Sequence, residues 1–112
     1  MTYQIKRTCQ EENYKNILLE VSIDNEIIGN ASIMVSGSEA YIERLDIDEK
    51  YQNLGYGTQA VKYISNLYDY TYTAPDNPDS QRLFEKIGNE MSKQKYDEVG
   101  AYVDQGFGVY EL

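Results

Sequence analysis

A six-residue segment near the middle of the chain, Gln52-Asn53-Leu54-Gly55-Tyr56-Gly57, has the composition of a loop that holds phosphate groups. Glycine lets the backbone come close to a ligand, and a helix that begins here leaves its first N–H groups without a partner. Such N–H groups, at the positive end of the helix dipole, bind pyrophosphate. On the glycines alone, a plain strand-to-helix turn explains the segment as well as a pyrophosphate site does.

Two other phosphate-binding signatures are absent from the sequence. No Gly-x-x-x-x-Gly-Lys-Ser/Thr run occurs, which excludes a P-loop nucleotidase. A dinucleotide fold would need three glycines after a strand of a parallel sheet, whereas the strands before Gly55 are predicted to form hairpins. Any phosphate site in this loop therefore belongs to another class.

Glu43 is the side chain best suited to act as a general base. Alternation along the strand expected over 40–48 puts it on one face with Leu45 and Ile47. Apolar surroundings of that kind raise the pKa of a carboxyl group toward the range useful for catalysis. The alternative is a partly solvated glutamate that pairs with a neighbouring lysine or arginine.

The first half of the chain is predicted to form strands that turn back on one another. Residues 2–9 alternate loosely, and Asp24-Asn25 further on tolerates the positive φ of a tight hairpin. Longer strands are expected over 17–23, 27–35 and 40–48, where apolar residues recur at every second position. The residues expected to share inward faces are Ile17, Leu19, Val21 and Ile23 in the first of these strands, Ile27, Gly29, Ala31, Ile33 and Val35 in the second, and Tyr41, Glu43, Leu45 and Ile47 in the third.

Helical spacing begins after Gly57. Ala60, Val61, Ile64, Leu67 and Tyr68 predict an amphipathic helix of about three turns. A short strand over 70–74, a break at 75–79 and a second helix that ends at Gly88 follow. Two further strands are expected at 99–102 and 106–110. This order predicts an α+β fold, a mostly antiparallel sheet with two inserted helices.

Length and composition favour one domain over residues 1–112. The chain is 41% apolar, which is ordinary for a globular protein, and no apolar run approaches the ~20 residues that cross a membrane. The N-terminus lacks the apolar segment of a secretory signal, and Cys9 has no second cysteine with which to form a disulfide. We therefore expect a cytoplasmic protein without a membrane partner.

The charge and the missing histidine exclude several classes of function. The sequence contains no histidine, which removes Ser-His and Cys-His nucleophiles and most zinc sites, so no metal is expected. A net charge of −9 argues against nucleic acid as a partner, since phosphate neutralisation dominates that affinity. The same charge suits a cationic partner such as an amine.

Two segments resemble the motifs of the GNAT superfamily of acyl-CoA-dependent N-acetyltransferases. The run from Tyr41 to Gly57 resembles that family's strand followed by Gln/Arg-x-x-Gly-x-Gly/Ala, with Gln52, Gly55 and Gly57 at the three fixed positions. Residues 77–88 resemble its Asn-x-x-Ala-x-x-Leu-Tyr-x-Lys-x-Gly helix. The resemblance covers roughly residues 17–112.

This resemblance implies a splayed, V-shaped sheet that binds acetyl-CoA as co-substrate in its split. The pantetheine arm would pair with the strand before the loop, a backbone N–H of that strand would polarise the thioester carbonyl, and the loop amides would hold the pyrophosphate. In several relatives a glutamate at the place of Glu43 serves as base or orders the amine. The expected cofactor-binding residues are Leu45, Ile47, Gln52, Asn53, Leu54, Gly55, Tyr56, Gly57, Thr58, Asn77 and Phe84.

The chain departs from the family pattern in ways that affect catalysis more than binding. Phe84 stands where many members have a tyrosine that protonates the departing thiolate, and a phenyl ring cannot donate a proton. Gly88-Asn89 replaces the usual Gly-Phe, and the loop has only Lys50 as a nearby cation. Residues 1–16 are too few for the two helices that normally build the acceptor pocket, so a shortened member is expected.

The sequence thus leaves two functions to be tested. The first is transfer of the acetyl group of acetyl-CoA to an amine, either a small molecule or a protein lysine. The second is a GNAT-like binding module that transfers weakly or not at all and acts through protein–protein contacts. Assembly into a homodimer is compatible with either.

Overall fold

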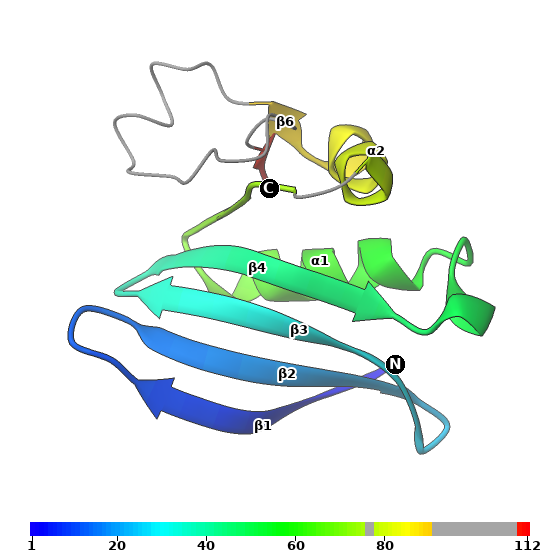
Figure 1. The fold of residues 1–112 in the computed structure, drawn as a ribbon, viewed down its shortest axis with the longest axis horizontal. Coiled ribbons are helices and arrows are strands. Elements are labelled where there is room, and N and C mark those ends of the chain that lie inside the picture. Colours follow the sequence, from blue (N-terminus) through cyan, green and yellow to red (C-terminus); the bar gives the residue numbers. More distant parts are fainter. Residues whose placement is uncertain (76–77, 91–109) are drawn as a thin grey trace.

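The computed structural model describes residues 1–75, 78–90 and 110–112, and its strands build one sheet (Figure 1). Its elements are β1 (Thr2–Gln10), β2 (Lys15–Ile23), β3 (Glu26–Ser36), β4 (Glu39–Ile47), η1 (Glu49–Tyr51, a 3-10 turn), α1 (Tyr56–Leu67), β5 (Tyr70–Thr73), α2 (Pro78–Ile87), β6 (Asn89–Glu90) and β7 (Tyr110–Glu111). The strand order in the described residues is β1-β2-β3-β4-β5-β7-β6, with β4 and β5 parallel and the other pairs antiparallel. The predicted α+β fold with a mostly antiparallel sheet is confirmed.

The hairpin between β2 and β3 forms where the sequence predicted it. Asp24 and Asn25 have φ values of 50° and 67°, in the left-handed region that short polar side chains tolerate. Beyond the turn, Leu19 pairs with Ala31 and Ile17 with Ile33. All four side chains are buried, so apolar alternation sets the register of the central strands.

A bulge in β3 reverses the predicted orientation of Ile27. Val21 pairs with Gly29 and the next residue, Ser22, pairs with Ile27, which leaves Ile28 as the extra residue. Ile28 is fully buried, whereas Ile27 is 54% exposed. The prediction that Ile27 faces the core was wrong, because simple alternation does not hold across a bulge.

The two helices cover the sheet near β4 and β5. Figure 1 shows α1 running alongside β4, and α1 buries Ala60, Val61 and Ile64. α2 begins at Pro78, as expected for a residue whose fixed φ suits the first helical position. Neither helix of the described part of the chain is long and apolar enough to span a membrane.

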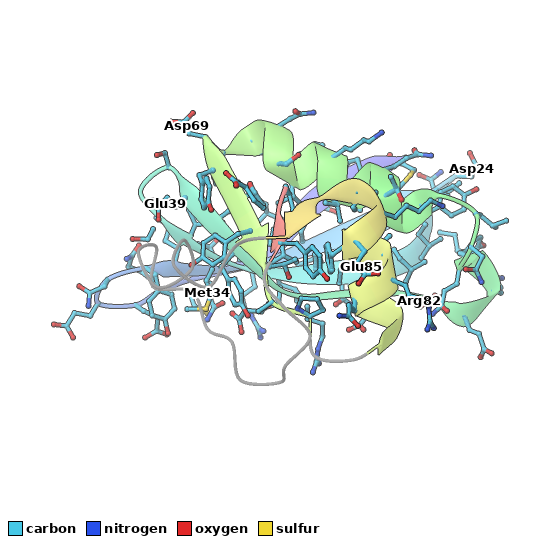
Figure 2. All side chains as sticks on the ribbon, turned by 90° about the horizontal axis from the view of Figure 1, so that it is seen from above. Asp24, Met34, Glu39, Asp69, Arg82 and Glu85 are labelled. Atoms are coloured by element: carbon cyan, nitrogen blue, oxygen red, sulfur yellow. The ribbon has the colours of Figure 1, made fainter. Side chains whose placement is uncertain are left out.

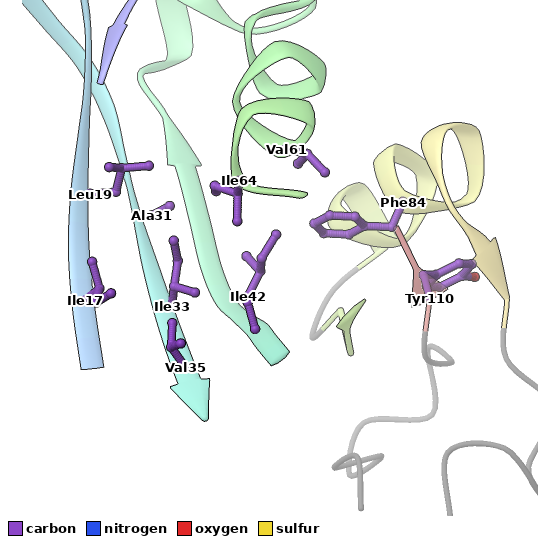
Figure 3. Close-up of a cluster of buried hydrophobic side chains, with 11 residues drawn as sticks. Ile17, Leu19, Ala31, Ile33, Val35, Ile42, Val61, Ile64, Phe84 and Tyr110 are labelled. Carbon is purple, nitrogen blue, oxygen red and sulfur yellow. The ribbon is translucent and has the colours of Figure 1, made fainter. Parts of the chain in front are cut away.

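The core joins both helices to the central strands. Figure 3 shows Phe84 of α2 directed toward Val61 and Ile64 of α1 and toward Ile42 of β4. Tyr110 of β7 lies in the same cluster. Burial of each such side chain is worth roughly 1.5–3 kcal/mol, so this cluster fixes α2 against the rest of the fold.

Part of the sequence prediction falls outside the described residues. This applies to Asn77, to the strand at 99–102 and to most of the strand at 106–110. The end of that last strand is present as β7, which pairs with both β5 and β6.

Candidate functional site

The sheet splits between β4 and β5. Only Glu39–Ile42 of β4 pair with β5, where their partners are Tyr70–Thr73. In contrast, β4 stays paired with β3 as far as Ile47. The Thr73 hydroxyl donates a hydrogen bond of 2.8 Å to the carbonyl oxygen of Ile42, at the last paired residues. Among the described strands none pairs with 43–47 on the β5 side. This part of β4 therefore has a strand edge on which an extended ligand can add.

Glu43 lies at a bulge in β4 at the start of that edge. Ser32 pairs with Arg44 and the adjacent Ile33 pairs with Ile42, so Glu43 has no partner residue in β3. A bulge of this kind interrupts the ladder and redirects the following side chains. It places Leu45 on the same side as the buried Ile42 and leaves the Glu43 side chain exposed. The predicted apolar surroundings of Glu43 are thus wrong.

The loop after β4 has the backbone shape that its sequence indicated. Gly55 has φ +86°, and a Cβ atom built on it would meet nothing within 4 Å, so the backbone conformation alone requires glycine. α1 begins at the next residue, and the amide of Gln59 donates the first helical hydrogen bond, of 3.1 Å, to the carbonyl oxygen of Gly55. The amides of 56–58 therefore precede the helical ladder and are available to a ligand.

A cleft of about 780 Å³ lies between this loop, the end of β4 and α2. Its described lining residues are Leu45, Asp46, Ile47, Tyr51, Gln52, Asn53, Gly55, Gly57, Thr58, Arg82, Leu83 and Lys86. The structure thus brings most of the residues predicted to bind the cofactor to one cavity. Among the described residues, Leu54, Tyr56 and Phe84 lie outside the lining. Leu54 is 60% exposed, and the Tyr56 ring packs edge-on against Tyr51, 6.1 Å between centroids.

Phe84 does not line the cleft. Its ring is 4% exposed and belongs to the core cluster with Ile42, Val61 and Tyr110. This packing does not test whether the position faces the acyl end of a cofactor, which stays a prediction. Its neighbour Leu83 lines the cleft instead, because adjacent helical residues point about 100° apart.

Side-chain hydrogen bonds tie the loop to two parts of the fold. The Gln52 amide donates to the carbonyl oxygen of Ile47 at 2.8 Å. The Tyr51 hydroxyl donates to Oε2 of Glu26 at 2.5 Å, and Nζ of Lys50 lies 3.3 Å from Oε1 of the same carboxylate. The hydrogen bond from Tyr51, followed by the contact with Lys50, lowers the pKa of Glu26, and Glu26 in turn raises the pKa of Lys50 and of Tyr51.

Sequence reasoning missed the residues that α2 contributes to the cleft. Arg82, Leu83 and Lys86 come from a helix that lies about 25 residues after the loop in sequence. Their i, i+1, i+4 spacing indicates a shared side of a helix, but the spacing does not say against which element that side would pack.

The sequence profile of the Acetyltransferase (GNAT) family matches residues 1–88 of this chain. The match covers most of the sequence, and the chain therefore belongs to this family. The resemblance inferred from the two motifs is confirmed over residues 17–88, whereas the match also includes β1 and does not extend over 89–112. No curated protein matches the chain in sequence.

Solved structures share the fold at low sequence identity. Gcn5 from Tetrahymena has a TM-score of 0.66 at 18% identity, over 91% of this chain and 69% of that one. A GNAT family acetyltransferase from Elizabethkingia anophelis with acetyl-CoA bound gives 0.60 at 19%, over 87% and 75%. The ribosomal-protein-S18-alanine N-acetyltransferase from Escherichia coli gives 0.56 at 21%, over 74% and 57%. This chain therefore spans between 57% and 75% of the length of these proteins.

Proposed function

We propose that this chain is an N-acetyltransferase that transfers the acetyl group of acetyl-CoA directly to an amine. The observation that carries the proposal is the position of the β4 strand edge, which continues into a glycine loop and a helix start along one cleft. An extended arm that ends in a diphosphate matches this arrangement. Membership of the GNAT family and the acetyl-CoA in the Elizabethkingia structure support the same choice.

In this proposal the chain binds the pantetheine arm as an added strand. The backbone groups of Leu45 and Ile47 pair with the amides of the arm, as in other cases of strand addition. The amides of 52–58 hold the diphosphate, with the left-handed backbone at Asn53 and Gly55 shaping the loop. The cleft, at about 780 Å³, is large enough for a ligand of this kind.

The chemical step needs a base and a group that polarises the thioester carbonyl. We assign the base to Glu43, which is exposed and stands two residues before Leu45, where β4 enters the described cleft lining; it accepts the proton that the amine loses. A backbone N–H at the bulge donates to the carbonyl oxygen, and one such donor is typically worth about 3 kcal/mol. A C–N bond forms as the C–S bond breaks, and the departing thiolate takes a proton from solvent or a nearby tyrosine. The acceptor is an amine, either small or a protein lysine, and the net charge of −9 favours a cation.

A binding module without transfer activity is the second candidate. The observation that favours it is Phe84, whose ring is part of the core and supplies no hydroxyl to the cleft. Such a module would still bind coenzyme A, or would retain only the cleft, and would act through contacts with other proteins. The two candidates differ only in turnover, so binding and transfer must be measured separately.

The test is calorimetric titration of acetyl-CoA and CoA into the wild type and Gly55→Val. The variant forces a β-branched side chain onto φ +86°, which costs ~1–2 kcal/mol unless the loop changes shape, so we expect affinity to fall at least tenfold. Gly37→Val is the matched control, because Gly37 has φ +61° in the β3–β4 turn, away from the cleft. Absence of heat with either ligand on the wild type would contradict the proposal.

Transfer is then measured by thiol release with polyamines and lysine peptides. Binding with release supports the enzyme, whereas binding without release across the panel supports the module.

A further inference from the structure

The cleft has a second wall that carries positive charge. Arg82 and Lys86 of α2 are the basic residues among its described lining, and they stand four positions apart, on one side of the helix. Figure 2 shows Arg82 on α2 at the end of the molecule where the chain passes through η1. Both side chains are exposed.

The loop wall offers little positive charge of its own. The nearest cation, Lys50, lies 3.3 Å from Glu26 and is not among the described lining residues. Asp46 brings a carboxylate into the lining, and Nε of Arg44 lies 3.7 Å from it. Backbone amides alone are therefore left to neutralise an anion from the loop side.

A close contact brings the two walls together. A Cβ atom built on Gly57 would lie 3.5 Å from Cδ2 of Leu83, so α2 packs against the first turn of α1. Arg82 and Lys86 flank Leu83 on the same helix. The N–H donors of α1 and the cations of α2 thus converge on one space from opposite sides.

We propose that Arg82 and Lys86 bind the diphosphate of coenzyme A from the α2 side, opposite the loop amides. This assignment rests on the proposed function and deepens it, because it names the side chains that replace the cations missing from the loop. Two cations match the two negative charges of a diphosphate, and a guanidinium can bind phosphate oxygens in pairs. The Gly57–Leu83 contact brings α2 to the glycine loop, where the proposed function puts the diphosphate.

The experiment compares CoA with dephospho-CoA, which keeps the diphosphate and lacks the 3′-phosphate. Dissociation constants are measured by calorimetry for the wild type, for the double variant Arg82→Gln/Lys86→Gln, and for Lys62→Gln, an exposed lysine of α1 outside the cleft lining. We expect the double variant to lose roughly 10- to 100-fold for both ligands, and Lys62→Gln to bind as the wild type does. The wild-type affinity should also fall more steeply with salt than that of the double variant.

Three results would overturn the assignment. If the double variant binds both ligands as tightly as the wild type, the assignment is wrong and the proposed function stands. If it loses affinity for CoA alone, the two cations bind the 3′-phosphate. If the wild type binds neither ligand, both the assignment and the proposed function are wrong. Thermal melting of the double variant checks the fold, and Lys86→Glu, which reverses one exposed charge, must weaken binding of both ligands further than Lys86→Gln.

Discussion

At the residue scale, individual side-chain hydrogen bonds hold the loop after β4 in shape. Gln52 reaches back to Ile47 in β4, and Tyr51 reaches across to Glu26 at the start of β3. The two partners belong to different strands, so the loop is fixed at two separate points. A loop ordered before the ligand arrives loses less conformational entropy on binding, which favours affinity.

Phe84→Tyr tests whether position 84 belongs to the core or to the cleft. The ring is 4% exposed among Ile42, Val61 and Tyr110, so an added hydroxyl enters an apolar cluster. We expect the free energy of unfolding to fall by about 1–3 kcal/mol in a urea titration, without faster thiol release. Phe84→Met, which adds no polar group, should cost less.

A different outcome would restore the sequence-based view of this position. If Phe84→Tyr is as stable as the wild type and releases thiol faster, its hydroxyl reaches the thioester, and the ring is not confined to the core.

At the scale of secondary structure elements, two bulges decide which residues of β3 and β4 face the core. The bulge at Ile28 and the bulge at Glu43 both lie in strands that frame the β4 edge. The second of them occurs one residue after the β4–β5 pairing ends at Ile42. Pairing of β4 with β3 is therefore interrupted at nearly the same point at which its pairing with β5 ends. Backbone groups of β4 without a partner strand are concentrated there.

Glu43→Gln tests the role of the residue at this bulge. The amide keeps the shape of the side chain but accepts no proton at neutral pH, so the loss should fall on the chemical step. We expect kcat to fall by roughly 100-fold or more while the affinity for CoA changes little. Glu39→Gln is the matched control, because Glu39 is an exposed glutamate at the start of the same strand. An unchanged pH–rate profile in Glu43→Gln would remove Glu43 from this role.

The elements could be predicted from the sequence, but the faces of two strands could not. The strand and helix positions follow from local periodicity, and the loop follows from Gly55 and Gly57, whose spacing is also local. A bulge adds one residue without changing composition, so the side on which Ile27 lies and the burial of Glu43 were predicted wrongly. The contribution of Arg82 was missed for another reason, since it depends on how α2 packs against α1.

At the scale of the whole molecule, the charge is distributed unevenly. The chain carries a net charge of −9, yet the described cleft lining contains Arg82 and Lys86 against Asp46 alone. A local positive wall on an acidic protein draws an anionic ligand to the cleft, while the remaining surface favours cations. This combination suits a reaction that joins an anionic donor to a cationic amine.

Tyrosines of the sheet and at the C-terminal end of α1 should limit stability in alkali. Burial, and then the carboxylates and tyrosine nearby, raises the pKa of Tyr70 to about 12, and burial also raises the pKa of Tyr3 and of Tyr68. The fold favours the neutral phenol, so the unfolded chain releases its proton first, near pH 10. This contribution to stability is therefore complete below pH 10 and is lost as the pH rises toward 12.

Tyr70→Phe isolates the contribution of one of these phenols. The variant has no hydroxyl to ionise, so its free energy of unfolding, measured by urea titration at successive pH values, should fall less steeply than that of the wild type between pH 10 and 12. Below pH 9 the two curves should run parallel, because neither chain carries a charge at position 70 there. Tyr70 packs against Tyr72 with 5.7 Å between ring centroids, a contact that phenylalanine preserves, so the comparison reports on the proton rather than on the packing. Equal slopes above pH 10 would mean that the fold does not favour the neutral form of Tyr70, and that the alkaline loss comes from other residues.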